Sequence, residues 1–449
     1  MRILITSASH PSALALARVL SSHGHTVLGA DTERIWRTSP ARYLRAYTQF
    51  TRLRRCNDLA RVVEGAVEII IPFGTQPHGL DDILSKRLAV MRHDLFSRNE
   101  IFQDFVRERV INTGQAGIVK VPMAWDVQAY APLKAVLVQH PLTTFCLQRT
   151  PYVGFEDGGE DEDEDTLVNG SSRSSSKSSC SSSGVETEFV GDGLLLSYMA
   201  LDDSLSAKLQ LLPMSHNNPC RVTELLSPGT VYSAHALVNG GRVLTFAVTT
   251  CSSTDSAQWT LVSSTDSLFG ILYNFTNVFV AAYQQWESES SLRDPGALCT
   301  HINIHFDVRE EIRYRELVRR ITALGCDSKP HGSIILLCKQ RPEEMALAYT
   351  DPEALRKTPV VLDAACPSGL YSLRTVVKEI WTVFRRFRWR TAWLLELADL
   401  VAMILAWELR FKEEMWDWRD PLPALVEWFV CWPLRSIRGW WLARAVESW

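Results

Sequence analysis

The N-terminal part of the chain alternates short apolar runs with an amphipathic stretch. Residues 2–5 (RILI), 25–31 (HTVLGAD) and 68–73 (EIIIPF) read as buried strands, and residues 12–23 carry apolar side chains at helical spacing before Gly24. Alternation of strand, helix and strand implies parallel strands joined by right-handed crossovers. Ligands of such sheets usually bind beyond the carboxyl ends of the strands. The pattern therefore predicts an α/β domain at the start of the chain.

Patterns further along the chain favour strands and then helices. Residues 235–248 (HALVNGGRVLTFAV) contain two apolar runs joined through residues 239–241 (NGG), which predicts a β-hairpin because Asn and Gly tolerate positive φ. Residues 301–308 predict another strand, and a helix is expected over residues 309–323. Beyond Thr358 the composition becomes helical and rich in tryptophan.

Residues 156–184 differ sharply from the rest of the chain. They contain the acidic block EDGGEDEDED and a serine-rich tract with almost no apolar side chains. Such a segment cannot bury enough apolar surface to offset the loss of chain entropy, which predicts disorder. The flanking residues read as strands, so we interpret the tract as an insertion within a domain, with an interdomain linker as the alternative.

Length and composition restrict the class of protein. A chain of 449 residues predicts two to three domains, and 46% apolar with 22% charged residues is globular composition. The formal net charge of −4 argues against a nucleic-acid partner, which usually requires a basic surplus. The ten cysteines lack CxxC spacing and the N-terminus lacks a secretory pattern, so we expect reduced thiols in a cytoplasmic protein.

The tryptophan-rich C-terminal region raises the question of membrane contact. Residues 391–409 are strongly apolar, but Glu396, Asp399 and Glu408 interrupt them, which disfavours a membrane-spanning helix. Basic residues and tryptophans are mixed in residues 388–395 and again over residues 433–449, as in peripheral amphipathic helices. Peripheral membrane contact through these helices is therefore one expectation, and packing onto the protein's own body is the other.

The first strand–helix turn, ITSASHPSALALA, has no glycine between Ile5 and Ala17. A dinucleotide site would need G-x-G-x-x-G here, so that the backbone can approach the pyrophosphate. A nicotinamide-dependent dehydrogenase is therefore disfavoured. Asp31 does stand at the ribose-binding position, after the second strand, but a loop or cap role is the alternative interpretation.

Residues 223–248 (TELLSPGTVYSAHALVNGGRVLTFAV) resemble the core of ATP-grasp proteins, in which an acidic residue, an apolar pair and a glycine precede Tyr-Ser and a hairpin. Residues 416–441 (WDWRDPLPALVEWFVCWPLRSIRGWW) are similar to the WDPLP-type tail of the group allied to the ligase that makes mycosporine-glycine. The glycine-poor first turn fits the pre-grasp domain of such proteins. The resemblance covers nearly the whole chain except the acidic and serine-rich insertion.

This resemblance implies an α/β fold in three parts. A pre-ATP-grasp Rossmann-like domain is expected over residues 1–125. A two-lobed ATP-grasp α+β domain is expected over residues 126–350, with the disordered insertion at 156–188, and a tryptophan-rich helical extension over residues 351–449.

The resemblance also implies a reaction and its cofactors. ATP-grasp ligases join a carboxylate, or an activated enol or carbonyl oxygen, to an amine; the acid is phosphorylated first, and the amine then displaces phosphate. The implied cofactors are ATP and Mg²⁺, and the implied partners are small-molecule carboxylate or enol and amine substrates. Glu224 matches the hinge acid that helps to hold adenine or ribose, with a solvated Glu at a strand edge as the alternative.

The family's triphosphate-binding lysine has no direct counterpart. The corresponding strand reads FCLQRT, with Gln148 at the lysine position and Arg149 beside it. Neighbouring strand residues face opposite ways, so Arg149 does not simply replace the lysine. Gln148 and Arg149 are the nucleotide-binding candidates on this strand. Lys134 and Lys120 are the alternative cations for the triphosphate.

The predicted strand HINIHFDV carries polar side chains on one face: His301, Asn303, His305 and Asp307. The family pattern is closer to HxSFDF, whose acid matches His305, and Asp307 lies two residues, about 6.6 Å, further along. We take His305 and Asp307 as candidate metal-binding residues. Two alternatives are a site for a softer metal, built from His301, His305 and Asp307, and a partly exposed polar strand face without a ligand.

Residues 324–334 (LGCDSKPHGSI) resemble the second metal motif of the family, IECNPRAH. Gly325 stands at the position of the metal-binding Glu, and Asp327 at that of the Asn. Asp327 is a hard oxygen donor and is predicted to hold Mg²⁺. Lys329 replaces the family's Arg and is predicted to contact phosphate as the catalytic cation.

Two functions follow from these observations. The first is an ATP- and Mg²⁺-dependent carboxylate–amine ligase, acting in secondary metabolism. The second is a degenerate, non-catalytic ATP-grasp-like protein that binds or scaffolds, peripheral to a membrane. The polar strand face and Glu224 favour the enzyme, whereas Gln148 and Gly325 favour the non-catalytic protein.

Overall fold

The structure is a computed structural model of the chain. It describes residues 1–31, 39–53, 67–73, 99–111, 118–141, 143–149, 189–190, 193–197, 203–210, 214–215, 220–225, 229–252, 255–290, 299–313, 316–328, 330–355, 358–362, 369–371, 411–413, 417 and 419–431. The predicted disordered insertion, the two predicted amphipathic segments at 388–395 and 433–449, and the catalytic candidate Lys329 lie outside these ranges.

The chain forms two compact units. The first contains residues 1–121 and 228–449, and the second contains residues 122–227. The second unit is thus inserted into the sequence of the first. The division into domains at 1–125, 126–350 and 351–449 stays a prediction.

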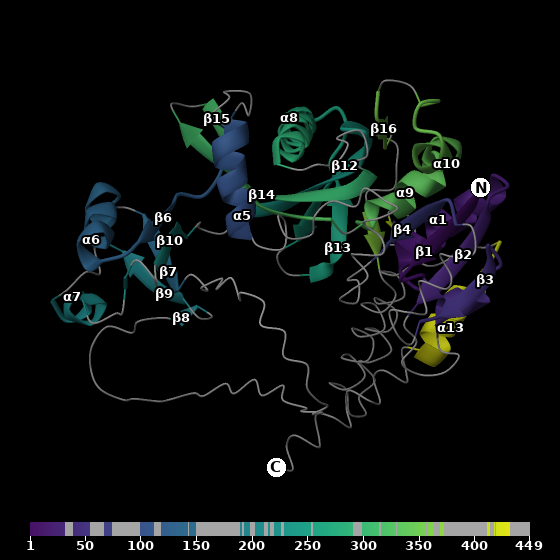
Figure 1. Cartoon of the computed structure of the whole chain (residues 1–449), viewed down its shortest axis with the longest axis horizontal. Helices are drawn as coiled ribbons and strands as arrows, with labels where there is room; N and C mark the ends of the chain where they lie inside the picture. The colour runs from purple at the N-terminus through teal and green to yellow at the C-terminus, as the bar shows by residue number, and fades with distance from the viewer. Residues whose placement is uncertain are drawn as a thin grey trace, which may run out of the picture. The chain divides into compact units, whose positions relative to one another are not determined.

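The first unit begins with a parallel four-stranded sheet in the order β3-β2-β1-β4 (Figure 1). The strands are β1 (Arg2–Thr6), β2 (Thr26–Asp31), β3 (Tyr47–Arg52) and β4 (Ile69–Pro72), and helix α1 (Pro11–Ser22) connects β1 to β2. The predicted strands and the first helix are therefore confirmed to within about two residues. Parallel pairing of β1 with both β2 and β4 agrees with the predicted Rossmann-like arrangement.

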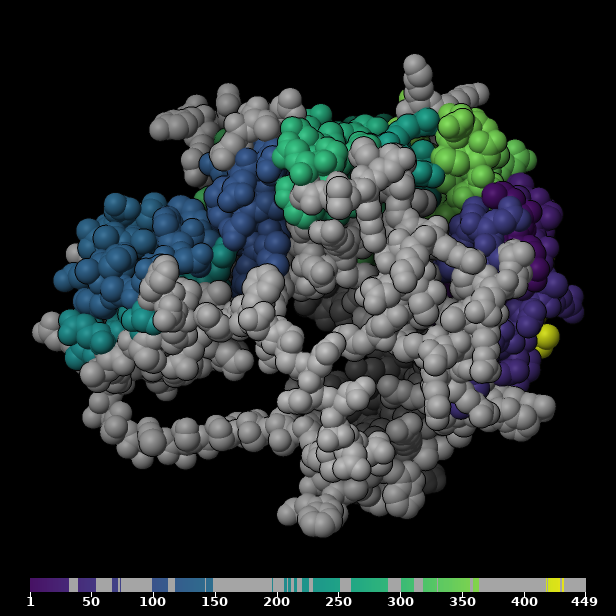
Figure 2. Space-filling model, viewed as in Figure 1, coloured from purple at the N-terminus to yellow at the C-terminus, as the bar shows by residue number. Residues whose placement is uncertain are grey.

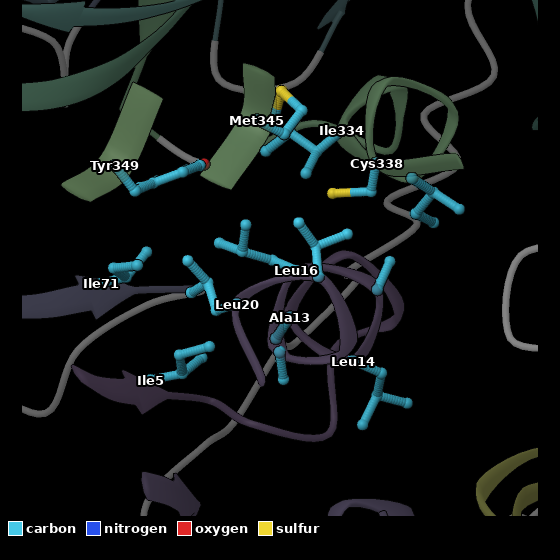
Figure 3. Packing of buried hydrophobic residues seen from close by; sticks show 14 of the residues in the cluster. Ile5, Ala13, Leu14, Leu16, Leu20, Ile71, Ile334, Cys338, Met345 and Tyr349 are labelled. Atoms are coloured by element: carbon cyan, nitrogen blue, oxygen red, sulfur yellow. The ribbon is translucent and has the colours of Figure 1, made fainter. Parts of the chain in front are cut away.

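Helix α1 is packed on both sides. Its apolar residues face β1 and β4 on one side, and α9 (Ser333–Gln340) and α10 (Pro342–Thr350) on the other (Figure 3). Leu16 and Leu20 of α1 are fully buried beside Ile334 and Met345. Two segments more than 300 residues apart in sequence therefore share one core, and this places the start of α9 next to the start of α1.

The same unit contains a nine-stranded sheet in the order β18-β17-β13-β12-β11-β14-β15-β5, with β16 paired to β12. Its long central strands are antiparallel. The strands are β5 (Val119–Lys120), β11 (Thr230–Asn239), β12 (Arg242–Ser252), β13 (Asp255–Leu261), β14 (Cys299–Arg313), β15 (Glu316–Asp327), β16 (Val360–Val361), β17 (Gly369–Tyr371) and β18 (Phe411–Glu413).

The predicted hairpin is confirmed as β11 and β12. Gly240 and Gly241, between the two strands, both have positive φ, at 56° and 72°. A two-residue loop of this kind requires positive φ at both positions, a conformation that glycine adopts at little cost.

Helices α5 (Asn99–Phe105) and α8 (Ser267–Ser290), with the π-helical turn η2 (Val106–Ile111), pack against one face of this sheet. Phe275 of α8 meets Phe306 of β14 edge-on, with ring centroids 5.4 Å apart. Both side chains are fully buried. The outer side of α8 lies at the molecular surface in Figure 2.

The helix predicted over residues 309–323 is wrong. These residues belong to β14 and β15, which pair along their length. Arg319 donates from Nε to Glu310 across the two strands at 3.0 Å, while Ile321 and Ala323 are buried against the core. The dense Arg and Glu residues obscured the two-residue alternation, and their cross-strand pairing is one reason why the segment is stable as a hairpin.

The second unit is a five-stranded sheet in the order β6-β10-β7-β9-β8 with two short helices. Its elements are β6 (Ala124–Val127), α6 (Tyr130–Gln139), β7 (Thr144–Arg149), β8 (Phe189–Val190), β9 (Gly193–Ser197), α7 (Asp203–Gln210) and β10 (Cys220–Glu224). Leu133 and Leu137 of α6 pack with Phe145 and Val222 in its core.

Residues 417–431, within the predicted tail, pack against the N-terminal sheet region. Helix α13 (Leu422–Val426) continues into the π-helical turn η5 (Glu427–Cys431) and contacts the 3₁₀ turn η1 (Pro40–Tyr43). The Asp420 carboxylate accepts from the Arg45 backbone N–H at 3.2 Å, and the Asp420 carbonyl accepts from Arg18 Nη2 at 3.1 Å. This part of the tail therefore packs on the protein's own body. No helix within the described residues has the length and apolar character needed to cross a membrane.

Candidate functional site

The predicted alternation along β14 is confirmed. Ile302, Ile304 and Phe306 are fully buried on the face that packs with α8. The opposite face carries the polar residues of the predicted metal strand, and the neighbouring strands add three more. In register, Ser233 of β11 lies opposite His305, His235 of β11 lies opposite Asn303, and Asn303 lies opposite Asp327 of β15. We call this set the polar face: Ser233, His235, His301, Asn303, His305, Asp307 and Asp327.

One hydrogen-bonded chain on the polar face joins a hydroxyl, an imidazole and a carboxylate. Ser233 Oγ lies 2.9 Å from His305 Nδ1, and His305 Nε2 lies 3.0 Å from Asp327 Oδ2. About one third of each of the His305 and Asp327 side chains is exposed. Two of the three predicted metal-binding residues are thus brought together, and His305 fixes the direction of the Asp327 carboxylate.

A second chain is buried. His235 Nε2 lies 3.2 Å from His301 Nδ1, and His301 Nε2 lies 3.0 Å from the Tyr349 hydroxyl of α10. Burial lowers the pKa of His301 to about 3, and burial together with the neighbouring His301 and His331 lowers that of His235 well below its usual range. Both rings are therefore neutral near pH 7. The contact with Tyr349 was not predicted from the sequence.

Asp307 is held by its own neighbours. Its Oδ2 accepts from Arg309 Nε at 2.9 Å, and its Oδ1 accepts from the Gly229 backbone N–H at 3.0 Å. A Cβ at Gly229 would collide with the Asp307 carboxylate, so this position requires glycine. Gly229, which belongs to the family-like segment 223–248, therefore has a structural role: it allows the backbone to approach Asp307 closely.

Asp307 and Asp327 are not brought together. Asp327 lies opposite Asn303, and Asp307 lies four residues further along β14, a separation of about 13 Å at ~3.3 Å per residue. In the described part of the chain, no group of three or more His, Cys, Asp or Glu side chains is arranged to hold a metal ion. Metal binding by Asp307, and the softer-metal site of His301, His305 and Asp307, stay predictions.

Two polar atoms near this face have unused hydrogen-bonding capacity. Asn303 Oδ1 and Arg309 Nη2 are buried and have no hydrogen-bond partner among the described residues. Buried polar atoms in native structures are normally satisfied, so atoms of this kind commonly mark a place for a ligand or an ion. Sequence reasoning missed Arg309, although its position on the Asp307 side of the same strand was a visible signal.

The nucleotide candidates lie in the second unit. Glu224, at the end of β10, accepts from the Met123 backbone N–H through Oε2 at 3.2 Å, and its own N–H donates to the Met123 carbonyl at 2.8 Å. Its side chain is half-buried. Gln148 pairs with Arg221, and Arg149 with Cys220, along β7 and β10. Shared nucleotide binding by Glu224 and the polar face stays a prediction.

Lys120, Lys134 and Asp31 are the other residues singled out in the sequence. Lys120 and Lys134 are exposed, on β5 and α6. Asp31 accepts from the Ser9 backbone N–H at 2.9 Å, which is the loop role expected of it outside a dinucleotide site. The first turn lacks glycine but still uses a positive φ, at Ser7 (48°).

A side chain at Gly325, which stands where the family has a metal-binding Glu, would have to displace the exposed side chain of Asn99. A Cβ built there would collide with the side-chain oxygen of Asn99 at the start of α5. We expect Gly325→Glu to lower the free energy of unfolding by about 1–3 kcal/mol through overpacking. Urea denaturation of Gly325→Glu, of Asn99→Ala and of the double variant measures this effect. The double variant should regain most of the loss, and a Gly325→Glu protein as stable as the wild type would contradict the collision.

Comparisons with known proteins give structural neighbours only. Neither family models nor curated proteins match the chain. In structure it is similar to an N5-carboxyaminoimidazole synthetase from Staphylococcus aureus (11% identity, TM-score 0.47, 79% of this chain and 78% of that one). It is also similar to an L-amino acid ligase from Bacillus licheniformis (9% identity, TM-score 0.41, 81% and 75%). A third neighbour is an ATP-grasp superfamily protein from Archaeoglobus fulgidus (9% identity, TM-score 0.37, 78% and 88%).

The third of these proteins is described as a member of the ATP-grasp superfamily, the class that the sequence resemblance named. The mixed parallel and antiparallel sheets agree with the predicted α/β fold.

Proposed function

We propose that this protein is an ATP- and Mg²⁺-dependent ligase that joins a small-molecule carboxylate, or an activated enol, to an amine in the cytoplasm. The observation that carries the proposal is the polar face of β14. Asp327 lies opposite Asn303, whose Oδ1 has no hydrogen-bond partner among the described residues. Further along β14, Asp307 holds Arg309, whose Nη2 has none among them either. Phosphoryl transfer requires oxygen ligands for Mg²⁺ and a cation for the phosphates.

The donor set fits magnesium. Mg²⁺ prefers oxygen ligands and is usually bound by one or two carboxylates together with substrate phosphates and water. Asp327 and Asn303 would supply such oxygens, and His305 keeps the Asp327 carboxylate in place through its 3.0 Å contact. When bound, the ion would neutralise charge that develops on the transferred phosphoryl group. Among the described residues, Asp327 and Asn303 are therefore the ligands that we propose for Mg²⁺.

The remaining candidate residues would bind the nucleotide and orient its phosphates. Arg309 would contact a phosphate through Nη2 while Asp307 holds its Nε, an arrangement that fixes the direction of the guanidinium. Glu224 would hold the adenine or ribose, and Lys329 would contact phosphate as a point charge. Gln148 and Arg149 are the further nucleotide-binding candidates.

Binding of nucleotide is tested by thermal denaturation with ATP and Mg²⁺. Ligand at 100 times its Kd stabilises the native state by about 2.7 kcal/mol, so the melting temperature should rise. Asn303→Ala and Arg309→Gln should each remove most of this rise. Arg107→Gln, a variant of a partly exposed arginine on η2 that pairs with Asp104, is the matched control and should keep it. If neither ATP nor ADP raises the melting temperature, with or without metal, the ligase proposal fails.

A non-catalytic nucleotide-binding protein, peripheral to a membrane, is the second candidate. It is favoured by Asp307, whose two carboxylate oxygens accept from Arg309 and Gly229, and by Gly325 at the position of the family's metal-binding Glu. ADP release measured with panels of carboxylic acids and amines separates the two. A protein that is stabilised by ATP but releases no ADP with any pair would support the non-catalytic candidate.

A further inference from the structure

The chain enters and leaves the second unit through two strands that are paired with each other. It crosses from the first unit at residues 121–122 and returns at residues 227–228. Strand β6 follows the first crossing and β10 precedes the second, and their antiparallel pairing reaches Ala124 opposite Thr223. One residue beyond this pair, the Glu224 backbone N–H donates to the Met123 carbonyl at 2.8 Å. The pairing therefore continues to the second residue of the unit.

The Glu224 carboxylate makes the second hydrogen bond of this last pair. In a regular hydrogen-bonded antiparallel pair, that bond would run from the Met123 N–H to the Glu224 carbonyl. Here the Met123 N–H donates to Glu224 Oε2, at 3.2 Å. The Glu224 side chain is half-buried, and an ionised acceptor makes a stronger hydrogen bond than a neutral carbonyl. Both backbone groups of Met123 are therefore bonded to Glu224.

Glu224 is itself held from the other side of its strand. Strand β10 lies between β6 and β7 in the sheet (Figure 1). Glu224 lies opposite Phe145 of β7, and the Leu225 N–H donates to the Thr144 carbonyl at 2.8 Å. The end of β10 is thus anchored to β7, and the Glu224 carboxylate extends this anchor to the strand by which the chain enters the unit.

We propose that Glu224 is a positioning residue, whose carboxylate clasps the entering and leaving strands so that the two crossings act as one two-stranded hinge. Two separate crossings each rotate about their own φ and ψ angles, whereas a tied pair keeps only the rotations that both share. This role acts through the backbone and is distinct from direct contact of Glu224 with adenine or ribose. The clasp does not depend on the ligase function, but its effect on nucleotide binding rests on the function proposed above.

Hydrogen exchange of the Met123 amide, measured by NMR in the full chain without nucleotide, tests the clasp. Glu224→Ala removes the acceptor and should make this amide exchange about tenfold faster, the loss expected for one hydrogen bond to a charged group. Glu224→Gln keeps an acceptor oxygen and should retain most of the protection. Asp126→Asn, at an acid of β6 whose side chain is 55% exposed, is the matched control and should exchange as the wild type does.

The hinge is measured as the spread of distances between labels on the two units. Ile101, on α5 of the first unit, and Val138, on α6 of the second, are 40% and 50% exposed, and spin labels can be attached there through unnatural amino acids. The distance distribution should be broader in Glu224→Ala than in the wild type, and as narrow as in the wild type in Glu224→Gln. Equal widths in all three proteins would overturn the hinge.

The outcomes separate the clasp from nucleotide binding. If Glu224 acted only as a nucleotide ligand, Glu224→Ala would leave Met123 exchange in the nucleotide-free protein unchanged, and that result overturns the clasp. With the clasp, Glu224→Gln should keep most of the ATP-dependent rise in melting temperature, and Glu224→Ala should reduce it. Faster Met123 exchange in Glu224→Ala, without any response of the wild type to ATP, would overturn the ligase proposal but keep the clasp.

Discussion

The free energy of unfolding should fall by about 6 kcal/mol when the pH is lowered from 7 to 5, because burial keeps the rings of His235, His301 and His331 neutral. Burial holds the pKa of His301 at about 3, that of His331 at about 4 and that of His235 well below its usual range, whereas all three should titrate near 6.5 in the unfolded chain. Between the unfolded and the folded pKa only the unfolded state takes up protons. The stabilisation is therefore complete above pH 6.5 and is lost as the pH falls, at about 2 kcal/mol per histidine over this interval.

Urea denaturation at pH 7, 6 and 5 measures this loss. His301→Gln removes one of the three titrating rings and should reduce the pH dependence by about a third. His23→Gln removes an exposed histidine from the end of α1 and serves as the control. Equal stability at pH 7 and pH 5 would contradict the prediction. It would show that the buried histidines, including His235 and His301 between β11, β14 and Tyr349, take up protons in the folded protein.

Phe306→Ala should lower the free energy of unfolding by about 3–5 kcal/mol, the usual range for removing a buried aromatic ring. The side chain is fully buried at the centre of β14 and meets Phe275 edge-on. Its loss leaves a cavity directly behind the polar face. We therefore expect the response to ATP to weaken along with stability.

Denaturation by urea provides the measurement, with Val318→Ala as the matched control. Val318 is 40% exposed on the neighbouring strand β15, and its truncation should change stability by no more than about 0.5 kcal/mol. Phe306→Leu keeps much of the volume and should lose less than the alanine variant. A loss below about 1 kcal/mol for Phe306→Ala would mean that the sheet closes around the missing ring.

Local periodicity was sufficient to predict much of the fold. The strands at residues 2–5 and 25–31, the first helix and the β11–β12 hairpin each have a pattern that is complete within one element. The same reasoning failed for residues 309–323, where charged residues occupy both faces of a strand pair. There the deciding contact, Arg319 to Glu310, requires knowledge of the register.

The site was predictable only in part, for the same reason. The polar alternation of β14 lies within one segment, so the common face of His301, Asn303, His305 and Asp307 could be inferred. The partners of these residues come from elsewhere: His235 is 66 positions from His301, and Tyr349 is 48. Arg309, two residues after Asp307 along the same strand, could have been identified from the sequence.

The contact between Arg18 and Asp420 spans 402 positions of the chain, so the surface that includes α1 and η1 is completed by residues that are synthesised long after α1. Contacts of such long sequence separation form late, because the intervening chain must first be ordered. On the ribosome, β1, α1 and β2 can pair early, but α9, α10 and α13 are still missing from their core. The nascent N-terminal sheet therefore exposes apolar surface until residue 431 has emerged, a period in which a chaperone has most to protect.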